Sequence, residues 1–219
     1  MQIAIDGPAG AGKSTIAKNL SKKLGWIYID TGAMYRATAL YCINNNIDLN
    51  NESKVENAIE KVNITLVYEN SSQLIFLNNV NVSHEIRTQE ISTATSLISK
   101  YKGVRNYLVK MQQMLASKND VIMDGRDIGT VVLPNAVLKI YLTASNEVRA
   151  KRRFQEQLVE GIAQPFEDVL KELNSRDKQD SEREHSPLCK ADDAIEMDTT
   201  HLDVNQIVEK IIALLNTRR

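Results

Sequence analysis

The fold follows from Gly7-Pro8-Ala9-Gly10-Ala11-Gly12-Lys13-Ser14, which matches the pattern G-x-x-x-x-G-K-[ST] at every position. The apolar residues of Gln2 to Asp6 directly before it predict a short strand. Behind it, apolar residues recur at helical spacing and predict a helix over residues 14–24. A glycine-rich loop between a strand and a helix is the context in which this pattern binds phosphate groups.

The residue types of this loop suit a triphosphate. Side chains at Gly7, Gly10 or Gly12 would crowd the backbone N–H groups that wrap phosphate oxygens, and the helix N-terminus favours anions. Lys13 can reach the β- and γ-phosphates, and the Ser14 hydroxyl can ligate Mg²⁺. We therefore expect ATP to be held by Gly7, Pro8, Ala9, Gly10, Ala11, Gly12, Lys13, Ser14 and Thr15. The alternative is a glycine-rich turn with an accidental Lys-Ser pair.

Size and composition narrow the classes of protein. The chain has 219 residues, of which 42% are hydrophobic and 25% charged, enough for one domain with a substantial core. A net charge of −1 argues against a general surface for nucleic-acid polymers. No apolar stretch approaches the roughly 18 residues that span a membrane. Since no signal peptide is evident either, we expect a cytoplasmic protein.

A second strand over Trp26–Ile29 completes a βαβ unit with the first strand and helix. The segment Asp30-Thr31-Gly32-Ala33-Met34-Tyr35-Arg36 follows at the carboxyl end of this strand, where open α/β sheets bind ligands. Its side chains Thr31, Tyr35 and Arg36 are therefore candidates for binding a second substrate. Helices are expected over residues 33–43 and 52–62.

The alternating pattern is interrupted between Ile64 and Val82. Strand-like residues over 64–69, 73–78 and 80–82, with a turn at 70–72, predict a small antiparallel insertion. The remainder predicts a mostly helical stretch over 86–117, strands at 121–123, 137–142 and 194–197, and helices over 146 to about 160, 166–174 and 204–215.

Several arginines lie where phosphate chemistry would need them. Arg36 and Arg126 each follow a strand end, and Arg176 and Arg183 flank two aspartates in a polar stretch. Three more, Arg149, Arg152 and Arg153, have the spacing of one helix face. Phosphoryl transfer requires such groups to stabilise the charge of the transferring phosphoryl. Surface salt bridges are the alternative. Similarly, Asp124 at the end of a buried strand is either a metal-associated acid or the cap of an Asp-Gly turn.

Taken together, these motifs resemble those of the bacterial cytidylate kinases, relatives of the nucleoside monophosphate kinases. The resemblance runs nearly end to end. It rests on the phosphate loop, on residues 30–36, on Asp124-Gly125-Arg126-Asp127-Ile128-Gly129-Thr130, and on Arg176-Asp177 with Asp180 and Arg183 before Ser186-Pro187-Leu188.

The resemblance implies an α/β P-loop kinase fold: a five-stranded parallel sheet flanked by helices, a small antiparallel β insertion and a helical lid. One domain would cover residues 1–219. Its core would comprise 1–30, 118–145 and 190–219, its monophosphate-binding region 31–117 with the insertion at about 63–83, and its lid about 146–167.

The resemblance also implies site residues. The cytosine edge would be read by Ser96, Arg105 and Asp127, the CMP phosphate by Arg36, Arg126 and Arg183, and the ribose by Arg176 and Asp180. We expect Lys13, Arg126, Arg183 and Arg153 to stabilise the transferring phosphoryl, and Ser14 and Asp124 to bind Mg²⁺.

The predicted reaction is phosphoryl transfer from ATP to CMP or dCMP by a monomer. An aspartate accepts from the cytosine 4-amino group and an arginine donates to N3, whereas uracil reverses both groups. The alternatives are another small kinase, acting on UMP, AMP or a metabolite such as shikimate, and a nucleotide-switch ATPase. Whether ATP loss requires a nucleotide acceptor discriminates these classes.

Overall fold

The computed structural model describes residues 1–69, 72–159, 161 and 164–218. Contacts between Cα atoms divide the chain into two compact units. Unit 1 comprises residues 1–28 and 119–219, and unit 2 comprises residues 29–118. Within the described residues, no helix is both long and apolar enough to span a bilayer.

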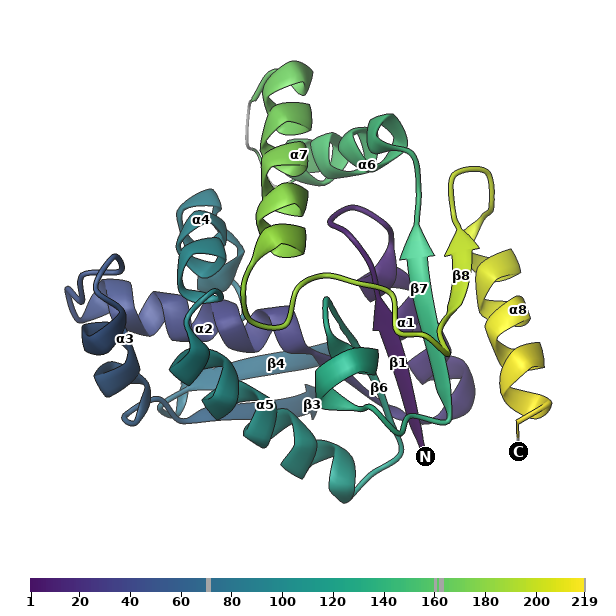
Figure 1. Ribbon diagram of the computed structural model, residues 1–219, viewed down its shortest axis with the longest axis horizontal. Coiled ribbons are helices and arrows are strands. Elements are labelled where there is room, and N and C mark those ends of the chain that lie inside the picture. Colours follow the sequence, from purple (N-terminus) through teal and green to yellow (C-terminus); the bar gives the residue numbers. More distant parts are fainter. Residues whose placement is uncertain (70–71, 160, 162–163, 219) are drawn as a thin grey trace. The chain divides into compact units, whose positions relative to one another are not determined.

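A five-stranded parallel sheet has the order β2-β6-β1-β7-β8. Its strands are β1 (Gln2–Asp6), β2 (Ile27–Asp30), β6 (Val121–Gly125), β7 (Leu138–Thr143) and β8 (Ile195–Asp198). In register, Ile3 of β1 lies opposite Ile122 on one side and Leu138 on the other. The central strands are apolar runs buried on both faces, as parallel sheets require. The predicted sheet is confirmed, and Figure 1 shows β1, β7 and β8 as neighbouring arrows that point the same way.

The core of unit 1 is formed by this sheet and two amphipathic helices, α1 (Lys13–Leu24) and α8 (Val204–Asn216). Buried Ile16 and Leu20 of α1 join Ile207 and Ile211 of α8 in one apolar cluster with the strands. Helix α1 ends at Gly25, which has a φ of 70° and donates its N–H to Ser21 O. The packing of α1 in this core therefore fixes the position of Lys13, the first residue of the helix.

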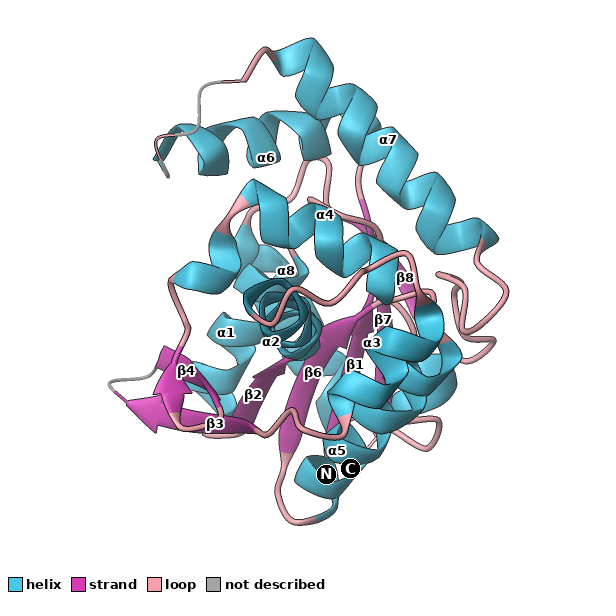
Figure 2. Ribbon diagram, turned by 90° about the vertical axis from the view of Figure 1, so that its left-hand side faces the viewer, coloured by secondary structure: helices cyan, strands magenta, loops and turns pink. Residues whose placement is uncertain are grey.

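Two further helices, α6 (Asn146–Val159) and α7 (Phe166–Glu182), pack together in unit 1 (Figure 2). The rings of Phe154 and Phe166 meet edge to face, with centroids 6.0 Å apart. The predicted end of the first helix near Glu160 lies outside the described residues. The predicted end of the second at Asn174 is wrong, because α7 continues through a polar segment to Glu182.

Unit 2 is mainly helical with a small sheet. It contains α2 (Thr31–Asn44), α3 (Glu52–Ile59), β3 (Ile64–Glu69), β4 (Ser72–Leu77), β5 (Val80–Asn81), the 3-10 helix η1 (Glu85–Arg87), α4 (Gln89–Ile98) and α5 (Lys102–Ser117). The strands pair antiparallel in the order β3-β4-β5, which confirms the predicted insertion. Residues 70 and 71 of its predicted turn lie outside the described residues.

Two predicted helix bounds in unit 2 are corrected. Helix α2 starts at Thr31 rather than Ala33, because the Asp30 carboxylate caps it by accepting the Ala33 N–H at 2.8 Å. Helix α3 ends at Ile59 rather than Val62, where the Val62 N–H turns back to Ile59 O at 3.0 Å. The cap matters for the site, since the helix that it starts carries Arg36 six residues after Asp30.

Candidate active site

The phosphate loop joins β1 to α1 and depends on glycine at two close approaches. Gly7 has a φ of 145°, and a Cβ there would lie 2.0 Å from Leu142 O. Gly10 has a φ of 72°, and its Cβ would lie 2.8 Å from Arg149 O. The protein's own backbone therefore excludes side chains at both positions. At Gly12 a Cβ would make only ordinary contacts, 3.8 Å from Arg152 NH1 and from Ile16 Cδ1. The φ of 86° at the N-terminus of α1 is what favours glycine there.

Lys13 is buried at the start of α1, and its Nζ donates to Pro8 O at 2.7 Å. Burial, followed by the nearby charge of Arg126, lowers the pKa of Lys13 to about 7. The ammonium thus lies over the loop in a setting that penalises its charge. An anionic phosphate in this loop would relieve that penalty.

Ser14 and Asp124 meet, as the magnesium prediction requires. The Ser14 Oγ donates to Asp124 Oδ2 at 2.7 Å, and the Tyr28 hydroxyl donates to Asp124 Oδ1 at 2.8 Å. Mg²⁺ prefers oxygen ligands and is usually held by one or two carboxylates together with water and substrate phosphates. This pair fits such an ion. Among the described residues no cluster of three or more His, Cys, Asp or Glu side chains could hold a metal.

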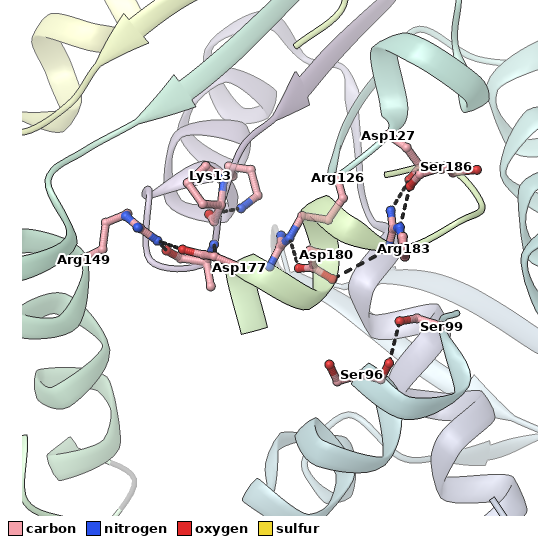
Figure 3. Close-up of polar contacts among 12 residues, drawn as sticks. Lys13, Ser96, Ser99, Arg126, Asp127, Arg149, Asp177, Asp180, Arg183 and Ser186 are labelled. Carbon is pink, nitrogen blue, oxygen red and sulfur yellow. Dashed lines mark hydrogen bonds and ion pairs between the residues drawn. The ribbon is translucent and has the colours of Figure 1, made fainter. Parts of the chain in front are cut away.

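Arg126, Asp127, Asp180 and Arg183 form one ion-pair network in unit 1 (Figure 3). Arg126 Nε donates to Asp180 Oδ2 at 2.8 Å, and Arg183 lies 3.7 Å from Asp180 and 3.9 Å from Asp127. Burial opposes the charged form of Asp180, yet Arg126 and Arg176 lower its pKa overall. The network therefore holds the guanidinium groups of Arg126 and Arg183 in a largely buried place, each beside a carboxylate.

Helix α7 carries Asp180, one of the two acidic residues of that network. The sequence placed Arg176 and Asp180 in a polar stretch, whereas both belong to the last turns of α7. The helix ends before Arg183, whose Nε donates to Ser186 O. The chain then returns as Leu188 N–H donates to Asp180 O at 2.7 Å. The segment after α7 is thus tied to the backbone of the same residue, Asp180.

The three arginines of α6 separate in their contacts. Arg149 is buried, and its NH1 donates to Ala9 O at 2.9 Å. Arg152 donates to Thr199 O at 2.8 Å and approaches Gly10 O at 3.5 Å. Arg153 pairs with Glu156 at 3.3 Å on the same helix. Arg149 and Arg152 therefore contact the phosphate loop, while a catalytic role for Arg153 stays a prediction.

In unit 2, Asp30 contacts Arg36, the residue of this unit that is predicted to bind the acceptor phosphate. Its Oδ2 accepts from Arg36 NH2 at 2.9 Å and pairs with Arg87 NH2 at 3.3 Å. Thr31 and Tyr35 are buried on the same helix, α2. Arg87 was not predicted. It lies in η1, shortly after the β insertion. The sequence pattern predicted the strands of the insertion, but no motif included Arg87.

The residues of unit 2 that are predicted to read the base, Ser96 and Arg105, lie at the junction of α4 and α5. Arg105 is buried, donates to Ser99 O at 3.1 Å, and stacks over the Tyr35 ring at 5.6 Å. Ser99 in turn donates its hydroxyl to Ser96 O at 3.0 Å. Figure 3 shows the two serines side by side. Arg105 is thus held in place, and its base contact stays a prediction.

Asp6 is a further residue that the sequence did not single out. Its two carboxylate oxygens accept the N–H groups of Ile128 and Gly129 at 2.8 and 2.7 Å. Burial raises the pKa of Asp6 to about 6, although both hydrogen bonds oppose the rise. Asp6 thereby fixes the segment that follows Arg126 and Asp127. Its position at the end of a predicted strand, like that of Asp124, is the sequence feature that could have identified it as a site residue.

Comparison with known proteins identifies the family. The family model described as cytidylate kinase matches residues 3–217. The chain belongs to the cytidylate kinase family. It is 49% identical to the cytidylate kinase of Bacillus subtilis (strain 168) over 97% of this chain and 95% of that one. It is 48% identical to that of Lactobacillus johnsonii, over 100% and 95%. The predicted family is confirmed.

Solved structures of other kinases share the fold of this cytidylate kinase family member. A gluconokinase from Sinorhizobium meliloti 1021 has a TM-score of 0.51 at 14% identity, covering 99% of this chain and 91% of that chain. A shikimate kinase from Bacteroides thetaiotaomicron has a TM-score of 0.51 at 12% identity, covering 99% and 98%. At such identities the likeness concerns the fold alone, and it agrees with the predicted P-loop kinase architecture.

Proposed function

We propose that the protein catalyses ATP + CMP ⇌ ADP + CDP and also accepts dCMP. The observation that carries the proposal is the family match over residues 3–217. The arrangement of the phosphate loop supports it, since Lys13, Ser14 and Asp124 lie together at one sheet edge. The predicted monomeric state and cytoplasmic location stay predictions.

In this proposal the loop amides and Lys13 hold the donor phosphates. Mg²⁺, when bound, would neutralise phosphate charge, and Ser14 and Asp124 would hold it. The acceptor is already a phosphate oxygen, so no general base is required, and catalysis consists of positioning and electrostatic stabilisation. The guanidinium of Arg126 is paired with Asp180 and is 18% exposed, so it supplies positive charge with little bulk water to shed during the reaction.

Selection of the base rests on Ser96, Arg105 and Asp127. A buried arginine held by Ser99 O and Tyr35 is a rigid donor, suited to the acceptor N3 of cytosine. Uracil would present an N–H there, and each buried unpaired polar group costs about 1–3 kcal/mol. CMP is therefore expected to be preferred over UMP by roughly 10- to 100-fold per mismatched group.

A coupled assay with purified protein tests the proposal. ADP release from MgATP is followed with CMP, dCMP, UMP and AMP in turn, and without acceptor. We expect rapid turnover with CMP and dCMP, slow turnover with UMP and little with AMP. Turnover of AMP or UMP in place of CMP would favour another small kinase. ATP loss that needs no acceptor would favour an ATPase.

A further inference from the structure

Asp177 of α7 reaches the phosphate loop. Its Oδ1 accepts the Ala9 N–H at 3.2 Å, and its Oδ2 pairs with the NH1 of Arg149. Figure 3 shows Asp177 between Arg149 and the loop that ends at Lys13. The predicted site assigns no role to this carboxylate. Of its two neighbours, Ala9 belongs to the predicted ATP-binding loop and Arg149 contacts that loop.

The two groups that hold Asp177 are of the kind that hold a phosphate. One is a backbone N–H of the loop, and the other is a guanidinium that is about 5% exposed. Loop amides and arginines bind phosphate oxygens through the same charge-assisted hydrogen bonds that they offer to a carboxylate. The Asp177 carboxylate therefore occupies two anion-binding donors, one in the loop and one on α6.

Arg149 is anchored independently of Asp177. Its Nε donates to Ala144 O at 3.1 Å, its NH2 to Asn146 Oδ1 at 2.6 Å, and its NH1 to Ala9 O at 2.9 Å. These neutral acceptors fix the position of the guanidinium but do not balance its charge. A buried guanidinium needs an anion, and either Asp177 or a nucleotide phosphate can supply it.

We propose that Asp177 is an internal anion that competes with the donor nucleotide for Ala9 N–H and Arg149, and so sets the affinity for ATP. This inference rests on the proposed function, because it takes ATP as the ligand of the loop. When the terminal phosphates bind, they repel the carboxylate and replace it at both donors. The carboxylate is on the same helix as Arg176 and Asp180, so its release alters the restraint on the helix predicted to bind the acceptor's ribose.

Asp177→Asn tests the competition. The amide has the same shape and keeps an oxygen that can accept from Ala9 N–H, but it removes the negative charge. We expect the Kd for MgATP, measured by isothermal titration calorimetry without CMP, to fall about fivefold, as expected when one charge-assisted hydrogen bond loses about half its strength. Unchanged or weaker ATP binding by the folded variant would overturn the proposal, because Asp177 would then only support Arg149.

Asp168→Asn is the matched control on the same helix. Asp168 pairs only weakly with exposed Lys171, at 3.7 Å, and should leave the Kd unchanged. An equal fall in both variants would assign the effect to net charge and overturn the proposal. Turnover of CMP is measured separately. If Asp177→Asn tightens ATP binding but the wild-type protein does not phosphorylate CMP, the proposed function fails and the competition stands.

A measurement on the wild-type protein covers the case of a variant that does not fold. The ¹³C resonance of the Asp177 carboxyl and the ¹⁵N–¹H resonance of Ala9 are followed as a non-hydrolysable ATP analogue is added. Displacement predicts that both shift together and saturate at the same concentration. An Asp177 resonance that stays constant while Ala9 shifts would contradict the exchange.

Discussion

At the scale of single residues, we expect Lys13 to couple nucleotide binding to proton uptake. Burial and Arg126 lower its pKa to about 7, so we expect the amine of the free enzyme to be largely neutral near pH 8. Donor phosphates favour the ammonium and raise the pKa, so binding takes up a proton. We expect MgATP binding at pH 8 to absorb up to about one proton, and this uptake to vanish below about pH 6, where Lys13 is already charged.

Calorimetry in buffers of different ionisation enthalpy measures this uptake. Lys13→Met provides the control, since it removes the titrating group while keeping an unbranched side chain. The variant should bind ATP more weakly and without proton uptake at pH 8. The same uptake in wild type and variant would show that another group titrates.

Arg87 is the second prediction at this scale. Arg36 and Arg87 share the single charge of Asp30, which leaves one net positive charge (+2 − 1 = +1) for an acceptor phosphate. Arg87→Ala removes that excess, and because the side chain is 45% exposed the loss should be modest. We expect KM for CMP to rise about two- to fivefold with KM for ATP unchanged. Steady-state kinetics checks this, with exposed Lys54→Ala as the control, and an equal rise in both KM values would refute it.

At the scale of elements, the carboxylate of Asp6 at the end of β1 holds the start of the π-helix η2 (Ile128–Val132) by hydrogen bonds. Asp6→Asn keeps one acceptor oxygen but leaves Ile128 N–H or Gly129 N–H facing an NH₂ group. This loss should lower the free energy of unfolding by about 1–3 kcal/mol at pH 7.

The wild-type protein and the Asp6→Asn variant should also differ in how their free energy of unfolding depends on pH. The folded-state pKa of Asp6, about 6, is raised from 3.8, so the folded state holds the proton more tightly than the unfolded state. Its contribution to stability is complete below about pH 4 and is lost as pH rises through 6. Urea denaturation between pH 4 and 7 should show this decline in wild type and not in Asp6→Asn. Parallel profiles would mean that Asp6 does not titrate in this range.

The elements also show what the sequence could supply. Buried strands and amphipathic helices such as α1 and α8 were predicted because apolar residues recur at their periods. The last turns of α7 were missed because residues 175–182 lack an apolar stripe. Contacts such as Arg126–Asp180 link residues 54 positions apart, and these can only be found in the fold.

The site shows the same division. Motif spacing predicted the loop, and the meeting of Ser14 with Asp124 followed from strand ends that share one edge. No local pattern indicated that Asp30 would hold both Arg36 and Arg87, since the second arginine comes after the β insertion. Similarly, Asp177 follows Arg176 in one of the family motifs, but it contacts Ala9, which lies 168 positions earlier in the sequence.

At the scale of the whole molecule, the predicted base-reading residues are distributed over both units. Arg105 belongs to unit 2 and Asp127 to unit 1. Asp127 is 3.9 Å from Arg183, whereas Arg105 is held by Ser99 and Tyr35, so each side chain has its own support within its unit. Substitutions at these two positions should therefore change substrate selection without disturbing the phosphate loop, which neither of these supports includes.

Arg105→Met and Asp127→Asn should each lower kcat/KM for CMP by about 10- to 100-fold. Arg105→Met leaves the cytosine N3 without its donor, and Asp127→Asn replaces a charged acceptor of the 4-amino group with a neutral one. Asp127→Asn should also narrow the ratio of CMP to UMP turnover, since an amide can donate to the uracil O4 that a carboxylate repels. KM for ATP should stay within about twofold of wild type, because the loop keeps Lys13 and Ser14. Kinetics with both acceptors measures the ratio, and an unchanged CMP-to-UMP ratio in both variants would show that other residues read the base.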